Sequence, residues 1–210
     1  MGTKHIITVA RQFGSGGREI ATALAKKLGV KYYDKDLISL AAKESGMSPE
    51  VFEKVDEQAT NSLLYSLSMG LYNFGNGFSA MGDLPMNDQL YIIQHKMIKR
   101  LAEEGPCVIL GRCADYVLRD FDNVVNVFIN ADMEYRKKRA IKYHNVDTKK
   151  AEQIINRTDK NRANYYSFYS GLKWGQPQNY DLCINSGRMT QENVVDLICN
   201  YVEMLENNDN

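Results

Sequence analysis

The feature that most constrains this chain is a glycine-rich segment between an apolar run and an amphipathic helix. The run at residues 5–10 (HIITVA) predicts a short buried strand, and it leads directly into RQFGSGG. Apolar residues then recur every four positions over residues 20–28, which predicts a helix that ends at Gly29. A second short strand is predicted at residues 30–33. The N-terminal segment therefore predicts a βαβ unit with a glycine-rich first turn.

The GSGG segment has the composition of an anion-binding loop. Glycines let the backbone turn several N–H groups toward one point, and no Cβ keeps an anion away. The following helix adds the positive end of its dipole. Arg18 adds a full charge and a forked donor that matches phosphate. The alternative is a plain glycine-rich turn between strand and helix. We expect the phosphates of a donor nucleotide to be bound by Gly14, Ser15, Gly16, Gly17 and Arg18, with Glu19 beside them.

The loop departs from the usual phosphate-binding motif GxxxxGK[ST]. When Gly17 and Arg18 are aligned with the Gly-Lys of that motif, Gln12 stands at the first glycine and Glu19 at the hydroxyl residue. Because a carboxylate cannot copy a hydroxyl on magnesium, Glu19 either ligates the ion directly or points away from it. Two classes of function stay open at this point: a phosphotransferase, and a regulatory nucleotide-binding protein that has lost catalysis.

The rest of the chain continues the alternation of helices and strands. Apolar runs predict three further strands, at residues 107–110, 124–129 and 181–185. Helical patterns occupy the segments between them, at residues 35–104, from 132 on, at 147–169 and from 190 on. Strands of this kind between helices are typical of a parallel sheet that is covered on both faces. We predict one α/β domain over residues 1–210, with a helical insertion at about 35–104 that contains a mobile loop at 73–87.

Composition limits the class of protein further. Apolar residues make up 44% of the chain and charged residues 25%, which are ordinary values for a folded globular protein. The formal net charge is zero, which argues against a general nucleic-acid binder. The sequence has no apolar run of membrane-spanning length and no signal-peptide pattern, so we expect a cytoplasmic protein that does not bind membranes. Four widely spaced cysteines argue against a metal site or a disulfide framework.

Two charged residues directly follow predicted strands. Arg112 comes after the strand at 107–110, and Asp34 comes after the strand at 30–33. Parallel α/β sheets bind ligands at the carboxyl ends of their strands. Both are therefore candidates for substrate binding, although Arg112 also fits a structural ion pair and Asp34 a helix cap.

Four more arginines lie in the basic helical region that follows. Arg136 and Arg139 are three positions apart and share one helical face, which is either a ligand-binding or a solvated basic face. Arg157 and Arg162 are five apart, so both reach one ligand only if the helix breaks or a lid loop intervenes. The tyrosines at 165, 166 and 169, with Trp174, fit a packed core better than a base-stacking platform.

Several segments, in order, resemble the cytidylate-kinase-like family of P-loop proteins. The strongest is ITVARQFGSGGREIATALAKKLGVKYYDKDLI, followed by GRCADYVL, EYRKKRA, RTDKNRANYY and YDLCINSG. The resemblance implies a P-loop NTPase-type three-layer sandwich with a five-stranded parallel sheet, a helical acceptor-binding insertion and a basic lid at about 144–175. It also implies ATP with Mg2+ as cofactors and a small-molecule nucleotide as acceptor. On this basis we assign catalytic roles to Arg18, Arg136, Arg139 and Arg162, and substrate binding to Asp34, Arg112 and Arg157.

Two departures from that family affect the acceptor. Cytidylate kinases carry an aspartate directly after the Gly-Arg of the third strand, where it helps to read cytosine; here Cys113 stands there, and the nearest aspartate is Asp115. Thr158 and Asn161 occupy the two aspartate positions of the lid motif. The acceptor is therefore left open between a nucleoside monophosphate and a non-nucleotide phosphorylated compound. The sequence defines no metal ligands and no oligomeric state.

Overall fold

Five parallel strands form the central sheet of the protein. The computed structural model describes residues 2–34 and 86–208. The strands lie in the order β2-β3-β1-β4-β5. In the central strand, Ile7 pairs with Val108 on one side and with Val125 on the other, and all three are fully buried. The strand bounds are β1 (Ile6–Arg11), β2 (Lys31–Tyr33), β3 (Cys107–Leu110), β4 (Val124–Asn130) and β5 (Leu182–Asn185).

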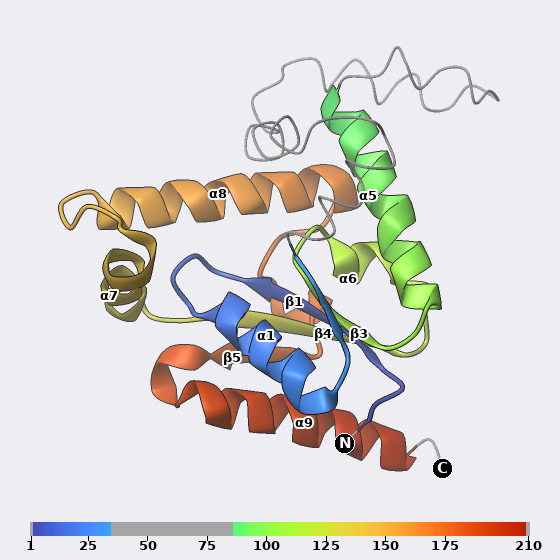
Figure 1. Cartoon of the computed structure of the whole chain (residues 1–210). Helices are drawn as coiled ribbons and strands as arrows, with labels where there is room; N and C mark the ends of the chain where they lie inside the picture. Colours follow the sequence, from blue (N-terminus) through green and yellow to red (C-terminus); the bar gives the residue numbers. More distant parts are fainter. Residues whose placement is uncertain (1, 35–85, 209–210) are drawn as a thin grey trace.

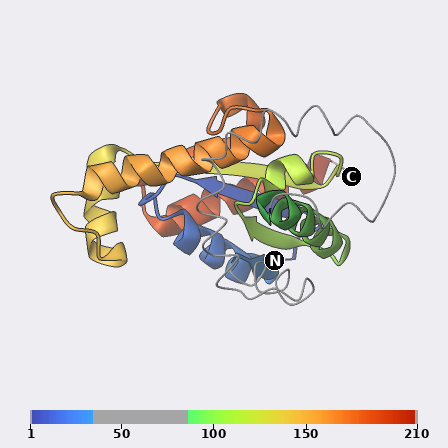
Figure 2. The same cartoon turned by 90° about the horizontal axis from the view of Figure 1, so that it is seen from above.

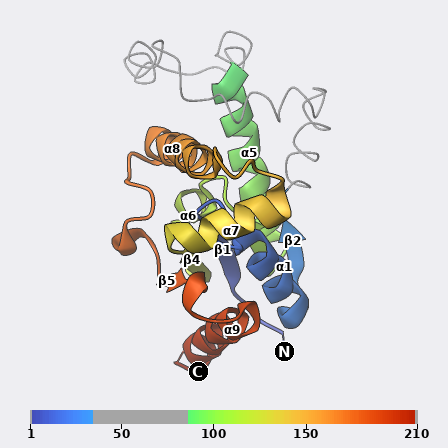
Figure 3. The ribbon, with the colours of Figure 1, turned by 90° about the vertical axis from the view of Figure 1, so that its left-hand side faces the viewer.

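Two helices, α1 (Gly17–Leu28) and α9 (Gln191–Asn208), cover one face of the sheet (Figure 3). Alternate side chains of β1 point toward them, and Ile7 and Val9 pack in one core with Leu24 of α1 and Ile198 of α9. Apolar positions four apart on α1 provide its buried stripe, as the sequence predicts.

The opposite face is covered by α5 (Met86–Glu103), α6 (Ala114–Val117) and α8 (Ala151–Ser170), as Figure 1 shows. Ile98 of α5 packs with Ile109 of β3 and Leu118 in a second core. The long helix α8 passes above the sheet from α7 (Met133–His144) toward α5 (Figures 1 and 2). Two short 3-10 turns, η2 (Pro177–Asn179) and η3 (Ser186–Arg188), flank β5.

The predicted fold class is confirmed, with five parallel strands between two helical layers. The helix predicted at 147–169 begins later, at Ala151, because the Asp147 carboxylate accepts a hydrogen bond from the Lys149 N–H and closes a turn there. Helix α5 begins at Met86, so the last two residues of the predicted loop at 73–87 are helical. The rest of that loop, and the insertion up to residue 85, lie outside the described residues. None of the described helices has the length and apolar composition of a membrane span.

Candidate functional site

The glycine-rich loop is fixed to the sheet by Gln12. The Gln12 N–H donates to the Ile129 carbonyl at 2.9 Å, and the Gln12 Oε1 accepts from the Ala131 N–H at 3.2 Å, so both bonds reach the end of β4. The Ser15 hydroxyl is buried and donates to the Gln12 carbonyl at 2.9 Å. The Ser15 N–H also donates to the Gln12 carbonyl at 3.3 Å, and the Ser15 carbonyl accepts from the Ser186 hydroxyl at 2.6 Å, so the polar groups of Ser15 hold the shape of the loop.

Helix α7 lies directly against this loop, which explains two of its glycines. Gly14 has a φ of +80°, and a Cβ there would lie 2.6 Å from the carbonyl oxygen of Arg136. Gly16 has a φ of +81°, and its Cβ would lie 3.2 Å from the Arg139 Cζ. A larger residue at Gly14 would push the α7 backbone away, and one at Gly16 would displace the Arg139 guanidinium, so the two glycines let Arg136 and Arg139 lie on the loop.

Three arginine–carboxylate pairs surround the loop. The Arg139 Nη2 lies 2.8 Å from the Glu19 Oε1, and the Arg18 Nη2 lies 2.5 Å from the Asp34 Oδ2. Arg136 is paired with Asp159 of α8. These contacts join the first turn of α1 to the end of β2 and to α7, and they join α7 to α8. Three of the predicted arginines are thus neutralised by carboxylates of the same chain.

Asp159 connects the loop to α8. Its Oδ1 accepts a hydrogen bond from the Phe13 N–H at 2.7 Å, and its Oδ2 accepts from the Arg136 guanidinium. The Arg162 Nη1 lies 3.8 Å from the Asp159 Oδ1. Burial nevertheless raises the pKa of Asp159, because these arginines and the N–H group offset only part of the desolvation of the carboxylate.

Arg11, at the end of β1, extends between two glycines. A Cβ on Gly17 would lie 2.5 Å from the Arg11 Cβ, and a Cβ on Gly111 would lie 2.2 Å from the Arg11 Nη1. The Arg11 guanidinium therefore packs directly on the backbone at the end of β3. Its position depends on the absence of a side chain at both glycines.

Arg11, Arg112 and Arg162 form a cluster of like charges. Desolvation lowers the pKa of Arg11 to about 9, and the charge of Arg162 is the next cause. Desolvation also lowers the pKa of Arg112 and of Arg162. Each of these residues keeps some accessible surface although protein atoms surround it. An anion bound among them would stabilise their charged forms.

The backbone at Arg112 is strained. Gly111, Arg112 and Cys113 all have left-handed conformations, with φ of +75°, +62° and +54°. Side chains adopt this conformation at a cost of about 1–2 kcal/mol per residue, and such strain concentrates at functional sites. The turn begins α6 directly after β3 and leaves Arg112 at the carboxyl edge of the sheet.

Arg157 and Arg162 are not brought together. Helix α8 is continuous between them, so the break that would let both reach one ligand does not form. The Arg162 Nη1 donates to the Arg11 carbonyl at 3.0 Å, whereas Arg157 is exposed. Of the residues predicted for the site, Arg157 is the one that lies apart from the others.

The prediction missed Arg11 and Asp159. The only sequence signal for Arg11 is its place directly after an apolar strand, which is the position that also singles out Arg112 and Asp34. Asp159 lies two residues after Arg157, inside the predicted lid, and has no local signal for its contact with the loop.

The loop and its surroundings fit the phosphates of a nucleotide. The Nε atoms of Arg136 and Arg139 are buried and have no hydrogen-bond partner among the described residues. Gly17 and Arg18, as the first residues of α1, have N–H groups without acceptors inside the helix. Magnesium usually needs only one or two carboxylates in addition to phosphate oxygens and water. Asp34 fits this requirement, because it uses only Oδ2 in its ion pair with Arg18.

Of the aromatic residues predicted as one cluster, Tyr165 and Tyr169 are in ring contact, with centroids 4.8 Å apart, and the others make further contacts. The Tyr166 hydroxyl donates to the Asp115 Oδ2 at 2.7 Å. The Tyr169 ring stacks on Tyr91 of α5, with centroids 3.8 Å apart. Trp174 packs edge-on against Phe128 on β4. Asp115 is buried, and burial raises the pKa of its carboxyl group.

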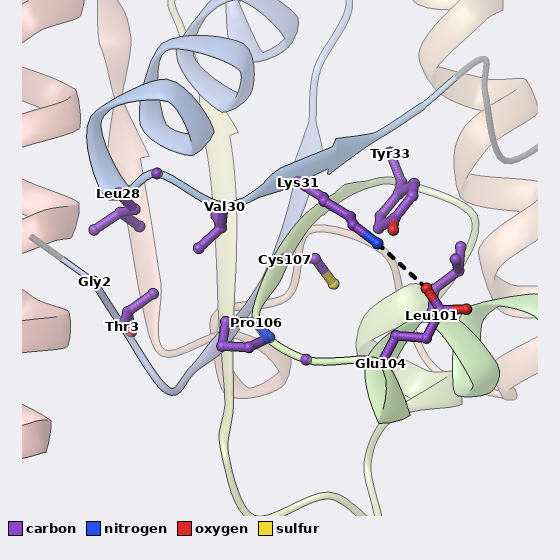
Figure 4. Close-up of a pocket in the computed structure, with 12 residues that line it drawn as sticks. Gly2, Thr3, Leu28, Val30, Lys31, Tyr33, Leu101, Glu104, Pro106 and Cys107 are labelled. Carbon is purple, nitrogen blue, oxygen red and sulfur yellow. Dashed lines mark hydrogen bonds and ion pairs between the residues drawn. The ribbon is translucent and has the colours of Figure 1, made fainter.

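A separate cavity of about 320 Å3 lies at the amino ends of β2 and β3 (Figure 4). Val30 and Pro106 line it with Cys107, and Lys31 and Glu104 form an ion pair of 3.4 Å at its edge. Because the strands are parallel, this cavity is at the opposite edge of the sheet from the glycine-rich loop. It contains none of the predicted site residues.

A sequence profile described as the cytidylate kinase-like family matches residues 6–188. The chain belongs to this family. Among its relatives, the cytidylate kinase of Pyrococcus horikoshii is 26% identical over 205 residues, which cover 97% of this chain and 91% of the relative. The cytidylate kinase of Archaeoglobus fulgidus is 27% identical, with 94% of each chain covered.

Solved structures support the assignment of this cytidylate kinase-like protein to a P-loop kinase fold. A crystal structure of an uncharacterized protein from Eubacterium ventriosum superposes with a TM-score of 0.69 and 27% identity, covering 95% of this chain and 98% of that one. Shikimate kinase from Bacteroides thetaiotaomicron gives a TM-score of 0.56 at 14% identity, covering 95% of this chain and 98% of that one, and thus shares the fold. Family and fold together support a kinase role.

Proposed function

We propose that this protein transfers the γ-phosphoryl group of ATP to a small phosphorylated acceptor, most simply a nucleoside monophosphate. The observation that carries the proposal is the convergence of six arginines on the glycine-rich loop and on the adjacent strand ends. Among the described residues, three carboxylates form ion pairs with four of these arginines. The arginines are Arg11, Arg18, Arg112, Arg136, Arg139 and Arg162, and the carboxylates are Glu19, Asp34 and Asp159.

This concentration of arginines suits phosphoryl transfer, which depends on positioning and on neutralising charge more than on covalent chemistry. In the proposal, the loop N–H groups and Arg18 bind the donor phosphates, while Arg136 and Arg139 reach them from α7. Arg11 and Arg112 lie at the ends of adjacent strands, where they orient the phosphate of the acceptor. Mg2+, when bound, would shield the phosphate oxygens.

Helix α8 contributes to both halves of the proposed site. In the middle of α8, Asp159 contacts the loop and Arg162 contacts the end of β1, and the last turn contacts α5 through Tyr169. Such a helix can exclude water from the transfer when donor and acceptor are both present. The predicted lid at 144–175 therefore has α8 as its main element, and its closure stays a prediction.

A second candidate function is a regulatory nucleotide-binding protein without catalysis. The observation that favours it is the ion pair between Glu19 and Arg139. Glu19 stands at the position where a magnesium-binding hydroxyl is usual, and this ion pair engages its carboxylate. The third alternative is a kinase of a non-nucleotide phosphorylated acceptor. It stays open because Cys113 stands where cytidylate kinases carry the aspartate that helps to read cytosine.

One assay separates these alternatives. ADP release is coupled to a dehydrogenase reporter in the presence of ATP, Mg2+ and, in turn, CMP, UMP, AMP, GMP and a panel of sugar phosphates. The proposal expects ADP release that depends on one class of nucleoside monophosphate. ATP binding by calorimetry without ADP release from any acceptor would favour the regulatory protein, and activity confined to a sugar phosphate would favour the third alternative.

A further inference from the structure

Phe13 is an aromatic residue of the glycine-rich loop that belongs to none of the three hydrophobic cores formed by the described residues. It is half-buried. In the alignment with GxxxxGK[ST], Phe13 stands at the first variable position, so the motif itself requires no ring there. Neither the core nor the bend of the loop therefore explains the ring, whereas its contacts with α7 and α8 do.

Helix α8, which passes above the sheet (Figure 1), contacts residues 11–13 through Arg162 and Asp159. The Arg162 Nη1 donates to the Arg11 carbonyl at 3.0 Å. The Asp159 Oδ1 lies 3.8 Å from the same nitrogen and accepts a hydrogen bond from the Phe13 N–H at 2.7 Å. The Arg162 Cζ lies over the Phe13 ring, 5.7 Å from its centroid, which is within the range of a cation–π interaction. One guanidinium is thus held by a carbonyl, a carboxylate and an aromatic ring.

The Arg162 guanidinium needs such contacts, because its surroundings disfavour its charge. Desolvation lowers the pKa of Arg162, and the positive charge of Arg112 lowers it further. An aromatic ring attracts a cation through its quadrupole and adds no negative charge. The Phe13 ring can therefore hold Arg162 without cancelling its charge, which a further carboxylate in its place would do.

Helix α7 meets the same ring through His144, its last residue. The centroids of the Phe13 and His144 rings are 4.9 Å apart, and the rings are tilted by 40°. Partial burial lowers the pKa of His144, so this imidazole is neutral at pH 7. Of the two side chains that contact the Phe13 ring, only Arg162 is then a cation. Phe13 is the point at which the loop, α7 and α8 meet.

We propose that Phe13 is a positioning residue whose ring holds the Arg162 guanidinium at the glycine-rich loop, with its charge available to the transferred phosphoryl group. This inference rests on the proposed function, which gives Arg162 its role. Phe13 acts through Arg162 and does not itself bind the phosphates with its side chain. Because charge on the moving group develops in the transition state, a misplaced Arg162 should lower turnover more than it weakens ATP binding.

The test changes the ring and leaves the backbone N–H of residue 13 in place. Phe13→Leu keeps an apolar side chain without a π face, so turnover with the best nucleoside monophosphate of the ADP-release assay should fall about tenfold. Phe13→Tyr keeps the face and should retain most of the turnover. ATP affinity, measured by calorimetry, should change much less than turnover. The matched control is Phe121→Leu, a half-buried position before β4 at the opposite edge of the sheet, which should alter neither quantity.

A double-mutant cycle shows whether Phe13 acts through Arg162. If the ring places the guanidinium, the variant that combines Phe13→Leu with Arg162→Ala should be no slower than Arg162→Ala alone. A ring that only supports the shape of the loop would lower turnover again by the same factor. The cycle is repeated for the free energy of unfolding in urea, where the two substitutions should also be non-additive, because the contact exists without turnover.

The outcomes distinguish this inference from the proposed function. Unchanged turnover in Phe13→Leu, an equal loss in Phe13→Tyr, or additive effects in the turnover cycle overturn the inference and leave phosphoryl transfer in place. If no acceptor gives ADP release, the proposed function fails; non-additive unfolding free energies then still support the contact that holds Arg162, and additive ones overturn it as well. Thermal unfolding verifies that each variant folds, and Phe13→Met provides the same test if Phe13→Leu does not fold.

Discussion

Replacing Gly111 with alanine should nearly abolish activity while reducing stability only slightly. Gly111 has a φ of +75°, and a Cβ there would lie 2.2 Å from the Arg11 Nη1. The left-handed conformation costs an L side chain about 1–2 kcal/mol. The contact itself is with the end of a flexible side chain, so the Arg11 guanidinium moves away instead of the backbone. The variant should therefore fold and lose the placement of Arg11.

Gly29→Ala is a matched control for the backbone effect. Gly29 ends α1 with a φ of +70°, and nothing lies within 4 Å of a Cβ built there. Both variants should lose about 1–2 kcal/mol of unfolding free energy, measured by urea denaturation. Turnover in the ADP-release assay should fall about 10²-fold in Gly111→Ala alone, which corresponds to about 3 kcal/mol of lost transition-state stabilisation.

Two results would refute this reasoning about Arg11. If Gly111→Ala keeps the turnover of Gly29→Ala, Arg11 does not act at the proposed site. If Gly111→Ala loses much more stability than the control, the alanine displaces the backbone, and the loss of activity then reports on folding. Arg11→Lys provides an independent variant, because it keeps a positive charge and removes the planar donor fork.

Four other outcomes follow from the same contacts. Arg18→Ala should weaken ATP binding about ten- to hundredfold in calorimetry through loss of a charge-assisted contact, and an unchanged affinity would contradict its role. Arg162→Ala should lower turnover about 10²-fold and affect ATP affinity much less, whereas the exposed Arg100→Ala should change neither. Glu19→Gln should reduce the dependence of activity on Mg2+ if Glu19 ligates the ion, and should alter only stability if its role is the ion pair with the loop arginine. Burial raises the pKa of Asp115 above its unfolded value, so the folded protein binds this proton more tightly. The contribution of Asp115 to stability therefore decreases as the pH rises from about 4 through the folded pKa. Asp115→Asn should remove this decrease, measured by urea denaturation at several pH values.

Local sequence was sufficient for most of the fold. The run at residues 5–10, the GSGG segment and the apolar spacing of α1 predict β1, the loop and the helix, because each is specified by neighbours within a few residues. The other four strands were predicted for the same reason. The order β2-β3-β1-β4-β5 was not predicted, because it depends on contacts between strands that are distant in the sequence.

For the site, the sequence by itself determined the loop and most of the arginines, and the tertiary structure decided which carboxylates they meet. Asp159 reaches the Phe13 N–H across 146 residues, and Glu19 meets Arg139 across 120. Arg11 acquires its position from Gly17 and Gly111, of which only the first is near it in sequence. Hydrogen bonds and ion pairs act over a few ångströms, so they depend on how helices and strands pack, whereas sequence patterns report only the face on which a residue lies.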